Sequence, residues 1–193
     1  MTSVYQGIDC ALRSGVKVVN ISIGGLGYGS ETEAAIFRYF NDTYPDSLLV
    51  FSAGNDGLKD NPDNPFYGSY PAKYGDFQGF ENIISVGNST NMDRRASDSN
   101  YGPSVDIFAP GNAIFSTWKD NDIDYKVIGG TSMAAPMVAG ALSAYWARNP
   151  ELSAQQVKAN MLQSADVVPA LQSGENPRLN LDRLMDLGSS SGF

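Results

Sequence analysis

Residues 16–23 read VKVVNISI and lead into a glycine-rich segment and then a helical pattern. The β-branched residues predict a strand, and the lack of regular polar alternation indicates that both of its faces are covered. Two similar runs follow, LLVFSA at residues 48–53 and NIISVG at residues 82–87. Buried strands that alternate with helices are typical of α/β proteins. We therefore predict three layers, αβα, with a mostly parallel, doubly wound sheet in the middle.

Helical patterns separate and follow these strands. Gly15 stands where a helix over residues 3–14 would end. Ser30 and Ser153 each precede a glutamate or glutamine by three residues, which is the spacing of a capping box at a helix start. We expect helices at residues 3–14, 30–41, 132–148, 153–164 and 179–187, and short strands at residues 105–108, 113–118 and 125–128, the last two as a hairpin. Residues 24–29 are expected to form a turn, and residues 54–79 a long polar segment.

Length and composition restrict the class of protein. The chain has 193 residues, with 13 basic and 21 acidic side chains and a net charge of −8. Such an acidic chain is not expected to bind nucleic acid, and no apolar run is long enough for a membrane helix. The single cysteine, Cys10, excludes an internal disulfide, and the sequence contains no histidine. We predict one domain over residues 1–187 and a flexible tail over residues 188–193.

Three segments place small or polar residues where ligands bind to parallel sheets, at the ends of strands. They are NISIGG at residues 20–25, FSAGNDG at residues 51–57 and GGTSMAAP at residues 129–136. The third sets Ser132 at the start of a helix, where unpaired N–H groups and the helix dipole stabilise negative charge. Helix physics alone would favour a simple N-cap for this serine. The presence of the other two segments in the same chain favours a chemical role for Ser132 instead.

Together these segments resemble the rear portion of a subtilisin-like serine peptidase of the subtilase family. The sequence GTSMAAP at residues 130–136 resembles the nucleophile motif of that family, and AGN at residues 53–55 resembles the strand end with the oxyanion-hole asparagine. Met137 differs from the histidine that usually follows the motif, at a position outside the catalytic triad. The resemblance runs from about residue 4 to residue 165. It implies a subtilisin-like fold that is N-terminally incomplete in this chain.

The resemblance also implies a role for each matched residue. Ser132 would attack a peptide carbonyl, and the Asn55 amide would donate, together with the Ser132 N–H, to the developing oxyanion. The implied substrate is a polypeptide, the chemistry needs no cofactor, and the location is secreted, although residues 1–15 lack the pattern of a signal peptide. The residues that would bind substrate are Ser22, Ile23, Gly24, Ala53 and Gly54.

The chain lacks the general base that this family needs, because it has no histidine. Asp9 and Asp42 fall in predicted helices outside any matching motif, so neither is assigned the role of the catalytic aspartate. A serine hydroxyl without its base is a weak nucleophile at neutral pH. We therefore expect a serine endopeptidase that is inactive as this chain alone and that needs a missing N-terminal portion, or a propeptide, as its partner.

Two further questions stay open at this point. The chain could instead be a non-catalytic, subtilase-like domain with a binding or structural role. The family often holds structural calcium, and the backbone carbonyls near Ala72 and Tyr74 are a conceivable site, although no side chain there requires a metal.

Overall fold

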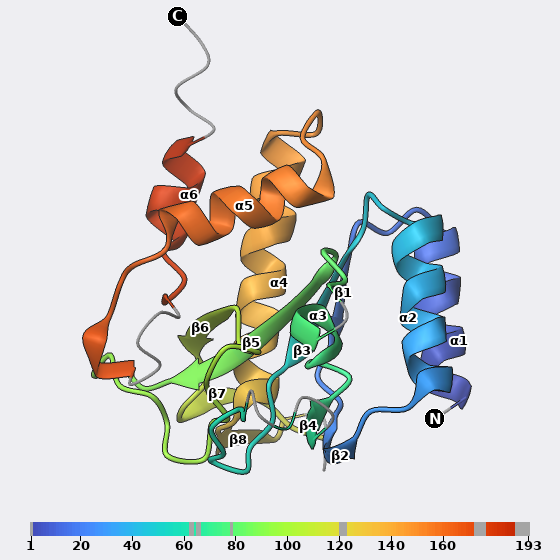
Figure 1. Ribbon diagram of the computed structural model, residues 1–193. Coiled ribbons are helices and arrows are strands. Elements are labelled where there is room, and N and C mark those ends of the chain that lie inside the picture. Colours follow the sequence, from blue (N-terminus) through green and yellow to red (C-terminus); the bar gives the residue numbers. More distant parts are fainter. Residues whose placement is uncertain are drawn as a thin grey trace, which may run out of the picture.

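A parallel sheet forms the centre of the protein, in a computed structural model that describes residues 2–61, 64, 67–77, 79–119, 123–171 and 177–187. Its strand order is β1-β3-β5-β6, and all three pairings are parallel. The four strands are β1 (Val18–Ile21), β3 (Leu48–Ser52), β5 (Ile83–Ser89) and β6 (Ile107–Pro110). Figure 1 shows helices on both sides of the sheet, α1 (Thr2–Arg13) and α2 (Glu31–Thr43) on one, and α4 (Thr131–Arg148), α5 (Ala154–Ser164) and α6 (Leu181–Leu187) on the other. The predicted three-layer α/β architecture is confirmed.

Alternate residues of β3 face opposite layers. Leu48 and Val50 belong to a core cluster with α4 and α5, whereas Leu49 and Phe51 belong to a second cluster with α1 and α2. All five residues of β3 are buried. A strand covered on both faces needs apolar side chains in both directions, which explains the missing polar alternation in this part of the sequence.

β1 differs from this pattern because it lies at the edge of the sheet. It is shorter than the predicted strand over residues 16–23, and its Asn20 is exposed while Val18 and Val19 are only half-buried. The prediction of a strand covered on both faces was therefore only partly right. Among the described strands, β3 alone pairs with β1.

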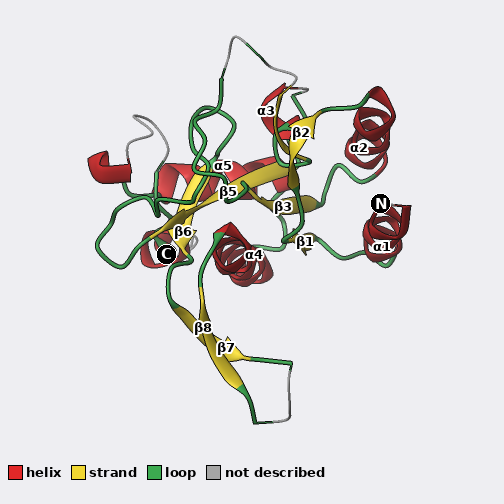
Figure 2. Cartoon of the chain, turned by 90° about the horizontal axis from the view of Figure 1, so that it is seen from below, coloured by secondary structure: helices red, strands yellow, loops and turns green. Residues whose placement is uncertain are grey.

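Two small antiparallel sheets stand outside the central one. β7 (Ile114–Thr117) and β8 (Tyr125–Ile128) form the predicted hairpin, which projects from the body in Figure 2. β2 (Gly25–Tyr28) pairs with β4 (Tyr67–Tyr70), and α3 (Tyr74–Phe77) follows directly. The predicted turn at residues 24–29 and the unbroken polar segment at residues 54–79 were therefore wrong. Glycine-rich strands lack an alternation signal, and their pairing depends on a partner far away in the sequence.

Local signals predicted the helix ends well. Gly15 has a φ of 78° and donates its N–H to the Leu12 carbonyl at 3.0 Å, which ends α1. Ser153 and Gln156 form a complete capping box at α5. Ser30 caps α2 by accepting the Glu33 N–H at 3.0 Å, but its own N–H donates to the Tyr74 hydroxyl instead of to Glu33. A short 3₁₀ helix spans Pro169–Leu171, and the predicted tail at residues 188–193 lies outside the described residues.

Candidate active site

The start of α4 meets the carboxyl ends of two neighbouring parallel strands. Ser22 follows β1, and its hydroxyl donates to the Ser132 carbonyl at 3.0 Å. Gly54 follows β3, and its N–H donates to the Thr131 hydroxyl at 3.2 Å. The three segments singled out in the sequence therefore lie together, as expected for residues beyond the same edge of a parallel sheet.

Asn55 is anchored to the residue just before Ser132. Its Oδ1 accepts the Thr131 N–H at 2.8 Å and the Thr131 hydroxyl at 2.9 Å. Because an amide oxygen accepts and an amide nitrogen donates, the bond from a backbone N–H fixes which end of the carboxamide faces Thr131. The NH₂ group therefore points away from Thr131, and it has no partner among the described residues. Sequence reasoning assigned no role to Thr131, although it lies within the matched motif.

The first turn of α4 keeps one backbone N–H without a partner among the described residues. Gly130 is its N-cap, with a φ of 146° and no side-chain cap. A Cβ at this glycine would lie 3.2 Å from Asn55 Oδ1, in a backbone conformation that other residues rarely adopt. In the described part of the chain nothing accepts from the Ser132 N–H. This N–H and the Asn55 NH₂ are thus two donors whose partners must come from outside the described protein.

Pro136 changes the backbone of Ser132 in a way that the sequence did not reveal. A proline has no N–H, so the carbonyl four residues earlier in the helix, that of Ser132, loses its helical donor. The Ser22 hydroxyl occupies that acceptor at 3.0 Å, and the Asn20 side chain donates in turn to Ser22 at 3.1 Å. Ser132 Oγ lies 3.5 Å from the Ser22 carbonyl. Ser22 therefore ties β1 to the helix that carries Ser132.

A cavity of about 390 Å³ joins most of the predicted site residues. Its lining includes Ser132, Asn55, Ser22, Ile23, Gly24 and Gly54. Ala53 does not line it, because it is buried and its carbonyl accepts from the side chain of Asn100 at 3.0 Å. The Asn100 amide oxygen also accepts the N–H groups of Asp56 and Leu58, which shapes the loop after β3. No sequence signal identified Asn100, because its partners are distant along the chain.

No imidazole serves this cavity, since the whole sequence lacks histidine. Asp9 pairs with Arg13 at 2.9 Å on α1, and Asp42 accepts from Asn41 on α2, so both carboxylates belong to the helical layer. Asp56 is the charged residue in the cavity lining, and its Oδ2 accepts from the Asn100 side chain at 3.3 Å. Among the described residues, the cavity lining thus brings together Ser132, Asn55 and one carboxylate, that of Asp56.

The proposed calcium carbonyls lie within the core. Ala72 and Tyr74 are buried, and the Ala72 carbonyl accepts the Gly75 N–H at 3.4 Å. Calcium takes six to eight oxygen ligands, usually with carboxylates among them. The described residues contain no cluster of three or more acidic, cysteine or histidine side chains that could hold a metal ion. This absence concerns side chains only, so calcium binding by the backbone carbonyls near Ala72 and Tyr74 stays a prediction.

Comparison with known proteins first identifies the type of fold. The chain superposes on a cold-adapted subtilisin-like serine proteinase with a TM-score of 0.74 and 30% sequence identity, over 92% of this chain and 60% of that one. The protease domain of PatA, in its S218A mutant, gives a TM-score of 0.77 at 24% identity over 98% of this chain and 66% of that one. The fold is thus subtilisin-like.

Sequence comparison then identifies the family. The model of the subtilase family matches residues 1–187, and the chain belongs to that family. It is 32% identical to subtilisin DY of Bacillus licheniformis over 164 residues, which are 85% of this chain and 55% of that protein. It is 37% identical to an extracellular serine proteinase of Thermus sp. over 163 residues, which are 83% of this chain and 36% of that protein. The chain therefore spans about half or less of these relatives.

Proposed function

We propose that this chain carries the nucleophile and the oxyanion-binding donors of a serine endopeptidase. Ser132 Oγ attacks the carbonyl carbon of a peptide bond, the C–N bond breaks, and an acyl-enzyme ester remains. The proton of the hydroxyl passes, through a base supplied from outside the given sequence, to the leaving amine. The Asn55 NH₂ and the Ser132 N–H donate to the carbonyl oxygen as it becomes negative. The observation that supports this most strongly is the anchored Asn55 amide. Its Oδ1 lies 2.8 Å from the Thr131 N–H, so its NH₂ group is left for a ligand in the cavity that Ser132 also lines.

The substrate of this site is an extended polypeptide. Residues 22–24 continue from the edge strand β1 into the cavity lining, and the Ile23 side chain is 57% exposed. Backbone groups beyond an edge strand can pair with a peptide that adds as a further strand. Gly24 and Gly54 both line this cavity. Ala53 supports its wall from within the core.

The base must come from residues outside the given sequence, since that sequence has no histidine. We infer that the chain is inactive alone and becomes active when the segments carrying a catalytic aspartate and histidine are supplied. Subtilase chemistry needs no cofactor. Secretion remains a prediction by analogy with the family, and among the described helices none is long and apolar enough to cross a bilayer.

Complementation tests this proposal. The N-terminal part of subtilisin DY that lies outside the match would be expressed separately, and also fused ahead of residue 1. Hydrolysis of unfolded casein is expected from either combination, and not from the chain alone. The S132A variant should abolish it without preventing association. A fusion or complex that folds and associates but cleaves nothing would contradict the proposal and favour the non-catalytic alternative.

A further inference from the structure

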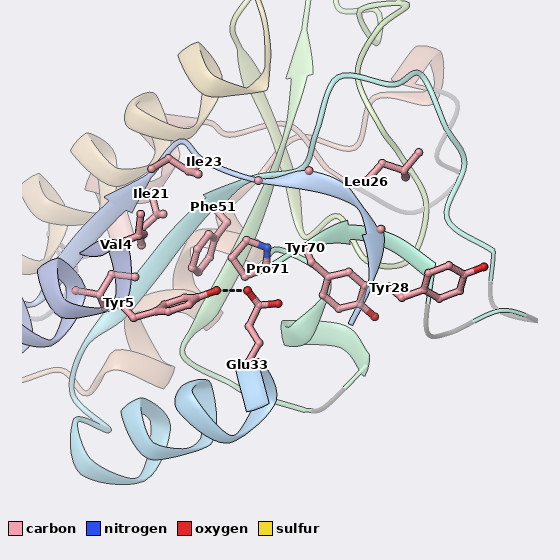
Figure 3. A pocket seen from close by; sticks show the side chains of 14 residues that line it. Val4, Tyr5, Ile21, Ile23, Leu26, Tyr28, Glu33, Phe51, Tyr70 and Pro71 are labelled. Atoms are coloured by element: carbon pink, nitrogen blue, oxygen red, sulfur yellow. Dashed lines mark hydrogen bonds between the residues drawn. The ribbon is translucent and has the colours of Figure 1, made fainter. Parts of the chain in front are cut away.

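A second cavity, of about 370 Å³, lies between α1, α2 and β2 (Figure 3). Most of its walls are apolar side chains from these elements and from the central sheet, among them Val4, Ile8, Ile23, Leu26 and Phe51. Among the described residues of its lining, Glu33 is the only acidic or basic side chain. The cavity thus combines an apolar body with one negative group.

Glu33 is held in place by two phenols. The Tyr5 hydroxyl donates to Oε1, as the dashed line in Figure 3 shows, and the Tyr74 hydroxyl donates to Oε2 at 2.9 Å. Burial is the main cause that raises the pKa of Tyr5, and the hydrogen bond to Glu33 raises it further. Burial likewise raises the pKa of Tyr74. Both phenols therefore remain neutral donors, which orient the carboxylate but bring no positive charge.

No lysine or arginine of the described residues forms an ion pair with Glu33. The ion pairs among the described residues involve other carboxylates, namely those of Asp9, Asp60, Asp93, Asp106 and Asp166. Hydrogen bonds from the two phenols reduce the cost of burying this carboxylate, and a cationic group beside it would reduce that cost further. The lining therefore suits a ligand with an apolar stem and a cationic end.

The position of the cavity indicates what that ligand is. Four consecutive residues, 23–26, line this cavity as well as the one that contains Ser132. A polypeptide that lies along this segment to reach Ser132 can place another of its side chains in the second cavity. We propose that the second cavity binds a lysine or arginine side chain of the polypeptide, its stem on the apolar wall and its charge at Glu33. The identity of the occupant, a polypeptide, rests on the proposed function.

Peptide binding to the intact chain tests this inference. The probes are acetylated, amidated alanine hexapeptides that carry lysine at each position in turn, and matching peptides with norleucine, which keeps the stem and removes the charge. Isothermal titration calorimetry is expected to show, at one position, roughly tenfold tighter binding of lysine, as for a hydrogen bond to a charged group. Equal affinities at every position, or no binding of any peptide, would overturn the inference.

Two variants with the same net charge test whether the preference for lysine depends on Glu33. E33Q should remove the lysine preference, whereas E31Q, in the same first turn of α2 but outside the cavity, should keep it. A preference that survives in E33Q, or that E31Q also removes, would show a general attraction to an acidic protein and would contradict the site. If E33Q fails to fold, the affinities of the lysine and norleucine peptides for the unmodified chain still test the inference. Binding needs no hydrolysis, so failed complementation would refute the proposed function and leave a measured lysine preference standing.

Discussion

The first N–H groups of a helix have no acceptor within the helix, and α5 and α4 differ in how these groups are satisfied. At α5 the Ser153 hydroxyl accepts the Gln156 N–H at 3.2 Å, and the Gln156 side chain accepts the Ser153 N–H at 2.9 Å. At α4 the N-cap is Gly130, which has no side chain to offer. The N–H of Thr131 is bonded by a residue from another strand end, Asn55, and the next N–H, that of Ser132, is left without a partner among the described residues.

Under the proposed function, this difference separates a helix start that adds stability from one that serves binding. A closed capping box satisfies its donors within the helix and stabilises it by about 1 kcal/mol. An open start keeps donors for an anion, and it depends on Asn55 to hold its geometry. Each of the following substitutions breaks or sharpens this comparison, in order of decreasing expected effect.

Replacing the Asn55 amide should have the largest effect, on catalysis. N55D keeps an oxygen that accepts from Thr131 but loses the NH₂ donor and adds a negative charge near the oxyanion. In the complemented protein we expect hydrolysis to fall about 100- to 1,000-fold, a magnitude taken from loss of such a donor in a subtilisin. N91D, at an exposed residue outside the cavity, is the charge-matched control and should leave kcat unchanged. Equal kcat values for N55D and the unchanged protein would remove Asn55 from the mechanism.

Adding a methyl group at Gly130 should destabilise the open helix start. The φ of 146° and the contact with Asn55 Oδ1 predict that G130A lowers the free energy of unfolding by about 1–3 kcal/mol. G140A is the same change within the same helix, at a site with no atom within 4 Å, and should raise it by about 0.5–1 kcal/mol. Urea unfolding measures both. Effects of the same sign would contradict the special geometry at Gly130.

Removing the cap of α5 should reduce stability without touching the site. S153A is expected to lower the free energy of unfolding by about 1 kcal/mol, because the Gln156 N–H loses the hydroxyl that accepts from it. Hydrolysis by the complemented protein should stay the same, and S153D should restore most of the stability. A loss of kcat in S153A would show that the two helix starts are coupled.

The smallest effect is expected from Ser22, and Pro136 provides its control. S22A leaves the Ser132 carbonyl without its donor, and should lower the free energy of unfolding by about 0.5–1 kcal/mol, since the pair is only partly buried. P136A would return a backbone N–H to that carbonyl. In a double-mutant cycle the cost of S22A should therefore shrink in the P136A background. An unchanged cost would mean that proline does not create the need for Ser22.

Signals that are local in the sequence predicted much of the fold. The uninterrupted apolar run of β3, the capping box at Ser153 and the stop at Gly15 each depend on residues within one turn or strand, and each prediction was right. The pairing of β2 with β4 was missed because two short segments far apart in the sequence, the first of them rich in glycine, carry no local signal of their pairing. The edge position of β1 is likewise a property of the whole sheet.

The site shows the same contrast between signals that are local in the sequence and contacts between distant segments. The motif around Ser132 and the strand end at Asn55 could be predicted only through the family resemblance, since helix physics alone favoured a simple cap. The structure adds what spacing cannot contain, namely the bond from Thr131 to Asn55 and the bond from Ser22 to the Ser132 carbonyl. Glu33 was predicted as half of a capping box, yet its carboxylate accepts from Tyr5 and Tyr74, which come from other elements.

The intrinsic reactivity of hydroxyl 132 tests the central claim most directly. The purified chain, without any added polypeptide, would be incubated with a fluorophosphonate, and intact-mass spectrometry would follow the adduct on Ser132 over time. With donors in place but no base in the chain, we expect very slow modification that accelerates when the complementing segment is added. Rapid, stoichiometric labelling of Ser132 in the chain alone would contradict the account.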